Sequence, residues 1–71
     1  MSRRGSDAKE LKRLVERLWT YRLEHRLTEQ TLAKRLGVAF VTVNRWLNRH
    51  TLPSELCAYR IRQLLRKRNR T

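Results

Sequence analysis

A glycine at position 37, set between two short apolar patterns, constrains the fold of this chain more than any other feature. In the first pattern, residues 29–36, helical spacing gathers one apolar face from Leu32, Ala33 and Leu36. Gly37 follows at once, and glycine readily takes the left-handed conformation that ends a helix and turns the chain. We therefore predict two short helices joined by a tight turn, with Val38 filling the gap between them.

The second helix of this pair, about residues 39–48, has two unlike sides. At about 100° per residue, its inward side gathers Ala39, Val43, Trp46 and Leu47. Its other side carries Phe40, Val41, Asn44, Arg45 and Asn48. An amide can pair with adenine, a guanidinium with guanine, and apolar carbons can touch a thymine methyl. This second side is therefore what base reading in DNA requires, although Phe40 is also compatible with packing against another helix.

A longer helix is expected before this pair. Asp7 and Glu10 fit an N-cap and its partner at the third helical position, so the helix should run over about residues 8–25. Its inward stripe consists of Leu11, Leu14, Val15 and Leu18. Arg22 continues that stripe, so its charge must reach the surface or find a buried partner. Trp19 and Leu23 lie off the stripe and are expected to cover a flank.

Another helix is expected after the pair. Pro53 and Ser54 open it, with Ser54 as N-cap and Glu55 at the positive helix end. The inward stripe consists of Cys57, Ile61, Leu64 and Leu65. We expect Leu52 to anchor the preceding basic loop in the core.

Charge narrows the choice of partner. Eighteen Lys and Arg against six Asp and Glu give a net charge of +12 over 71 residues, and Arg outnumbers Lys. Such an excess favours a polyanion, with nucleic acid as the first candidate and an anionic membrane surface as the second. A chain of this length makes one domain, which needs four or five helices around one small core.

Other function classes lack the residues they need. Cys57 is a single cysteine, and His25 and His50 are far apart, so we expect no disulfide and no metal site. No acid pair, nucleophile–base set or phosphate loop is present, so we predict neither an enzyme nor a cofactor or small-molecule substrate. No apolar run reaches the roughly 18 residues of a membrane span, and the basic beginning is not followed by the apolar region of a signal peptide. We expect a reducing, cytoplasmic location, nucleoid-associated in a bacterial or phage system.

The segment LTEQTLAKRLGVAFVTVNRW, residues 27–46, resembles the helix-turn-helix of the Cro/repressor-type (XRE-like) DNA-binding family. That family pattern is approximately L-T-x-x-x-L-A-x-x-L-G-V-S-x-x-T-V-x-R-W, followed by a short loop and P-S. The matching positions are Leu27, Thr28, Leu32, Ala33, Leu36, Gly37, Val38, Thr42, Val43, Arg45, Trp46, Pro53 and Ser54. The resemblance covers roughly residues 18–65. It implies a compact all-α, lambda-repressor-like bundle of about four to five helices, whose third helix lies in the major groove of double-stranded DNA.

Four departures from the family pattern are visible. Ala39 stands where the family has a capping Ser or Thr, and Arg49 where its loop often has Gly. Leu47 stands where the family often has a Glu that pairs with an Arg corresponding to Arg22. The first helix also begins earlier than in many relatives. None of these removes the expectation of DNA binding.

These observations define the predicted organisation and site. We predict a flexible basic arm over residues 1–6, a DNA-binding domain over 7–68 with its helix-turn-helix at 28–48, and a basic tail over 69–71. Base contacts are expected from Phe40, Val41, Asn44 and Arg45. Contacts to the DNA backbone are expected from Thr28, Gln30, Thr31, Thr42, Asn48, Arg49, His50 and Thr51.

The expected function is sequence-specific DNA binding, by a transcription regulator or a stand-alone module of natural or engineered origin, as a monomer or a homodimer. The alternatives are a protein-interaction module and an accessory domain that targets a larger assembly to DNA. RNA binding is disfavoured because few aromatic residues are available for base stacking.

Overall fold

The computed structural model describes residues 7–67, which form four helices and no strand. These are α1 (Ala8–Glu24), α2 (Glu29–Leu36), α3 (Phe40–Leu47) and α4 (Glu55–Lys67). The predicted all-α class is confirmed, and the predicted helices agree with these bounds to within a residue or two. The predicted arm over 1–6 and tail over 69–71 lie outside the described residues.

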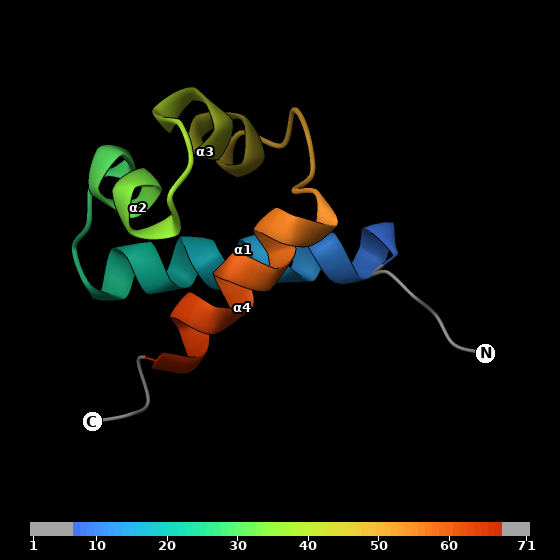
Figure 1. Ribbon diagram of the computed structural model, residues 1–71, viewed down its shortest axis with the longest axis horizontal. Helices are drawn as coiled ribbons and strands as arrows, with labels where there is room; N and C mark the ends of the chain where they lie inside the picture. The colour runs from blue at the N-terminus through green and yellow to red at the C-terminus, as the bar shows by residue number, and fades with distance from the viewer. Residues whose placement is uncertain (1–6, 68–71) are drawn as a thin grey trace.

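The four helices pack crosswise in two pairs. Figure 1 shows α4, in orange and red, crossing α1, and α2 and α3 lying together beside one side of α1. Helix α2 also packs on α4, and α1 on α3. Helix α3 therefore packs on α1 and α2 with one side, and its opposite side remains uncovered.

The helix starts follow from the residues that precede them. The Asp7 carboxylate accepts a hydrogen bond from the Glu10 backbone N–H at 2.9 Å. Thr28 accepts from the Thr31 N–H at 3.0 Å, and Ser54 from the Cys57 N–H at 3.3 Å. The caps predicted at Asp7 and Ser54 are confirmed, and Thr28 caps α2 in the same way. Each satisfies a backbone donor that the helix itself leaves unpaired.

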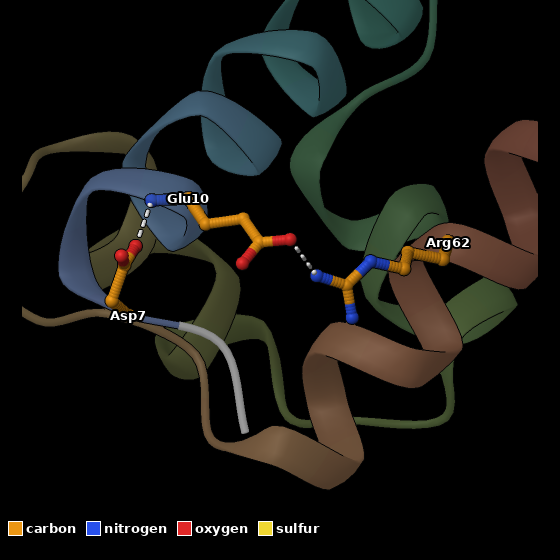
Figure 2. Close-up of polar contacts among 3 residues, drawn as sticks. All are labelled: Asp7, Glu10 and Arg62. Carbon is orange, nitrogen blue, oxygen red and sulfur yellow. Dashed lines mark hydrogen bonds and ion pairs between the residues drawn. The ribbon is translucent and has the colours of Figure 1, made fainter. Parts of the chain in front are cut away.

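The acidic partner of the first cap has a second contact. Figure 2 shows the Glu10 carboxylate turned toward Arg62 of α4, with 3.5 Å between Glu10 Oε2 and Arg62 Nη2. The start of α1 is thereby linked to the middle of α4. Because the Glu10 side chain is 59% exposed and the two groups are 3.5 Å apart, this ion pair contributes little to stability.

The first three helices end in the same kind of turn. One residue in each turn has a positive φ: Arg26 at 54°, Gly37 at 73° and Arg49 at 61°. A backbone N–H just beyond each of them then reaches back to a carbonyl of the last helical turn, as at Val38 and Ala33 with 3.0 Å. The left-handed conformation costs a residue with a Cβ atom about 1–2 kcal/mol, so only Gly37 meets this requirement without strain.

The last helix also contacts the turn at Gly37. Arg60 of α4 donates from Nη1 to the carbonyl oxygens of Leu36 and Gly37, each at 3.1 Å. A Cβ atom on residue 37 would lie 2.7 Å from that nitrogen. The turn between α2 and α3 therefore needs the φ freedom of glycine, and a larger residue would also displace the end of the flexible Arg60 side chain.

The core draws on every helix. Leu18, Leu32, Val43 and Ile61 are the largest fully buried side chains, one from each helix. Around them lie the remaining buried residues Leu11, Leu14, Val15, Tyr21, Ala33, Leu36, Trp46, Leu47, Ala58 and Leu65. Burying a side chain of this size stabilises the fold by about 1.5–3 kcal/mol. Most of the buried residues belong to the predicted stripes.

Four details of the packing differ from the sequence-based expectation. Ala39 is exposed rather than inward, because it lies in extended backbone before α3. Leu52 is 38% exposed and does not anchor its loop; the neighbouring Pro53 is buried instead. Tyr21 and Ala58, which the stripes did not include, are buried.

The Arg22 guanidinium stacks on the ring of Trp19. Its guanidinium carbon lies 5.3 Å from the centroid of the exposed Trp19 ring, which is within the range of a cation–π contact. Its Nε atom is buried and has no hydrogen-bond partner within the described part of the chain. Leu47, where many relatives of this type would supply a Glu, is buried and offers no acceptor.

The uncapped start of α3 gives a first prediction. Ala39 has the extended conformation of an N-cap, with φ −73° and ψ 149°, but no side-chain oxygen. We expect Ala39→Ser to raise the free energy of unfolding by about 0.5–2 kcal/mol, measured by chemical denaturation. Ala8→Ser is the matched control, because Asp7 already caps α1. Equal effects of the two substitutions would contradict the capping explanation.

Candidate nucleic-acid interface

The uncovered side of α3 carries large apolar side chains. Phe40 is 46% exposed and Val41 is 54% exposed, so neither belongs to the core. Arg45 is exposed one helical turn further along the same helix. Three of the four residues expected to contact bases therefore lie on the solvent side of α3.

Asn44, the fourth of these residues, is placed differently. It is half-buried, and its Nδ2 donates to Oε1 of Glu29 at 2.9 Å. Glu29 is the first residue of α2, so this bond joins the start of α2 to the middle of α3. The sequence analysis did not include Glu29 in the site, because no periodicity relates positions 15 residues apart. The available signal was an acidic residue at a helix start that otherwise carries Thr and Gln.

The start of α2 presents hydroxyl and amide groups. The Thr28 hydroxyl donates to Thr31 Oγ1 at 3.0 Å while accepting from the Thr31 N–H. This arrangement leaves the Thr31 hydroxyl hydrogen unused by the pair. Gln30 is exposed beside them. A helix N-terminus carries partial positive charge and is suited to a phosphate.

The turn after α3 presents the remaining polar residues. Asn48 Nδ2 donates to the Asn44 carbonyl at 2.9 Å, which closes the end of the helix. Arg49, His50 and Thr51 follow and are all exposed, while Thr42 on α3 is half-buried. The predicted backbone contacts thus lie in a group at the start of α2 and a group after the end of α3, with Thr42 apart from both on α3 itself.

Arg49 is held only weakly. Its Nη2 lies 3.8 Å from Glu16 Oε2 of α1, and the two side chains are 75% and 62% exposed. Exposed pairs of this kind contribute at most about 1 kcal/mol. The Arg49 guanidinium can therefore leave Glu16 for a phosphate at little energetic cost.

Between residues 7 and 67, no three His, Cys, Asp or Glu side chains come together in a way that could hold a metal ion. Within the same range, none of the helices combines the length and apolarity that crossing a membrane demands.

Comparison with protein families supplies the assignment. The helix-turn-helix family matches residues 20–68, more than half of the chain. This chain belongs to the helix-turn-helix family. The resemblance to its XRE-like members is confirmed, and the four-helix architecture fits the lambda-repressor-like fold. Proteins of this family bind DNA, typically regulate transcription and are generally not enzymes. No curated protein and no solved structure matched the chain.

The extent of the family match agrees with one departure noted in the sequence. The match begins at residue 20, so residues 8–19 of α1 precede it. Those residues nevertheless supply Leu11, Leu14, Val15 and Leu18 to the core. The early part of α1 is therefore an integral part of this helix-turn-helix domain.

The strained turn after α3 gives a second prediction. Arg49 has φ 61°, a conformation that glycine adopts freely. We expect Arg49→Gly to raise the free energy of unfolding by about 1 kcal/mol and to weaken binding to all DNA duplexes. Arg26→Gly is the control, because Arg26 has φ 54° in the turn before α2 and is not among the expected DNA contacts. It should give a similar stabilisation, measured by denaturation, with a smaller loss of DNA affinity.

Proposed function

We propose that this domain binds double-stranded DNA sequence-selectively, with α3 in the major groove, and acts as a transcription regulator or as a DNA-targeting module. The observation that carries the proposal is the uncovered side of α3, where Phe40, Val41 and Arg45 are exposed together in a helix-turn-helix fold. A major groove admits one α-helix. In a cell, such a protein would be associated with the nucleoid of a bacterial or phage system.

The side chains of α3 would divide the reading of bases. Arg45 would donate two hydrogen bonds to guanine O6 and N7, and Asn44 would pair with adenine. Phe40 and Val41 would contact a thymine methyl with their apolar carbons. Exposed apolar side chains gain by this contact because it removes their surface from water.

The two polar groups beside α3 would hold the DNA backbone. Phosphate contacts fix the register of a protein on the duplex, and base contacts select the sequence. The residues proposed for the backbone are Thr28, Gln30, Thr31, Thr42, Asn48, Arg49, His50 and Thr51. The net charge of +12 would strengthen binding to every duplex and would guide its approach.

The role of Arg45 gives a third prediction. We expect Arg45→Ala to cost about 1–3 kcal/mol on the preferred site and to relax preference at one base pair. The measurement is a titration against the preferred duplex and against random duplex. Arg17→Ala removes the same charge from an exposed position on α1 and should leave the ratio of the two affinities unchanged. If Arg45→Ala also left that ratio unchanged, the reading role would be wrong.

Salt dependence gives a fourth prediction. A protein that neutralises about four or more phosphates should lose on the order of a hundredfold in affinity between about 50 and 200 mM salt. Fluorescence anisotropy with labelled duplex at several salt concentrations gives the slope. Selection from a random duplex library would supply the site: a single short motif indicates a monomer, and a palindrome indicates a homodimer.

A second candidate function is supported by a groove between α1 and the turn after α3. Its volume is about 600 Å³, and its apolar lining comes from Val15, Trp19, Trp46, Leu47 and Leu52. A protein-interaction module would use such a groove. Weak DNA binding without sequence enrichment would favour this alternative, whereas steep salt dependence with an enriched motif supports DNA.

A further inference from the structure

Two partly exposed polar side chains from different helices hold each other beside the proposed DNA-contacting surface. Glu29 and Asn44 are both half-buried, and Glu29 Oε1 accepts from Asn44 Nδ2 at 2.9 Å. The Asn44 carbonyl, in turn, accepts from the Asn48 side chain at 2.9 Å. The Asn44 side chain therefore points toward the start of α2.

The chemistry of the pair fixes the direction of the Asn44 amide. An ionised carboxylate only accepts hydrogen bonds, whereas an amide has an accepting oxygen and a donating NH₂ group. Glu29 can therefore bind only the NH₂ end. Rotating the amide by 180° would set Oδ1 against a carboxylate oxygen, with no hydrogen between them.

The Asn44 amide still has hydrogen-bonding groups available to contact a base. The NH₂ group carries a second hydrogen, and neither the bond to Glu29 nor the bond from Asn48 uses Oδ1 of Asn44. Adenine recognition needs one N–H donor and one acceptor in a set order, because adenine offers N7 as acceptor and its N6 amine as donor. An amide with a fixed direction presents one order only.

A carboxylate at this place has a cost for general DNA affinity. Glu29 sits between Thr28 and Gln30, which are proposed to meet phosphates, and like charges repel. A neutral glutamine would keep a hydrogen bond to Asn44 without that repulsion. The negative charge is favourable at the positive end of α2 but unfavourable for general DNA affinity.

We propose that Glu29 is a positioning residue that sets the base preference of Asn44 by fixing the direction of its amide. This inference rests on the proposed function, since it assigns a role within the same DNA-reading surface. It adds a residue of α2 to the determinants of specificity on α3.

Glu29→Gln is the principal test. A glutamine side chain can accept or donate, so both directions of the Asn44 amide become possible. We expect the preference for A·T over G·C at the base pair read by Asn44 to fall by about fivefold or more. Affinity for random duplex should rise at the same time because a negative charge is lost. Titrations against the selected site, its single-pair variant and random duplex measure both effects.

Glu16→Gln is the charge-matched control. Glu16 lies on α1 and contacts Arg49 at 3.8 Å. Its neutralisation should also raise affinity for random duplex, while the A·T to G·C preference stays at the wild-type value. Thermal unfolding of each variant shows that it is folded at the temperature of the titrations. Glu29→Ala also removes the bond that fixes the amide and should lose the A·T over G·C preference in the same way.

A double-mutant cycle separates positioning from direct reading. In the Asn44→Ala background, Glu29→Gln should leave the A·T to G·C preference unchanged. A further change in that background would show Glu29 contacting the base itself and would overturn the inference. An unchanged preference in Glu29→Gln alone, with a selective wild type, would overturn it while sparing the proposed function. If the wild-type protein showed no preference among duplexes, the proposed function would be wrong, and this inference would be wrong with it.

Discussion

The turn at Gly37 is the constraint on which the rest of this structure depends. Its φ of 73° reverses the chain between α2 and α3, and Arg60 of α4 donates to the two carbonyl groups at the turn. Arg60 of the last helix thereby helps to fix the angle between α2 and α3. The same angle brings Glu29 to Asn44 and leaves Phe40 and Val41 uncovered. A helix with no assigned contact to DNA thus helps to shape the surface proposed to meet it.

Several local features of this domain favour charge over stability. Arg26 and Arg49 occupy left-handed positions that glycine would fill without strain. Arg22 keeps a buried Nε atom without a hydrogen-bond partner among the described residues. In a small domain the total stability is only a few kcal/mol, so these features are significant. Arg49 lies beside the proposed DNA surface, where its charge supplies a reason for the strain.

Features set by residues close in the sequence could be predicted, whereas features set by contacts between helices could not. The caps at Asp7, Thr28 and Ser54 were predictable because each joins residues three positions apart. The stripe of α1 was correct up to Leu18 but continued into Tyr21 rather than Arg22. Which of two adjacent residues faces inward at the end of a 17-residue helix depends on where the other helices cover it. The expectation that Leu52 anchors its loop was wrong for a similar reason, because Pro53 occupies the buried position in that loop.

The sequence by itself determined the four helices, the glycine turn, the positive charge and the outward side of α3. These properties are set by side chains within about one helical turn of each other and by composition. Only the tertiary structure decided that Glu29 holds Asn44 and that Arg60 holds the turn at Gly37. Those contacts join residues 15 and 23 positions apart, and their existence depends on how the helices cross, which no local pattern encodes.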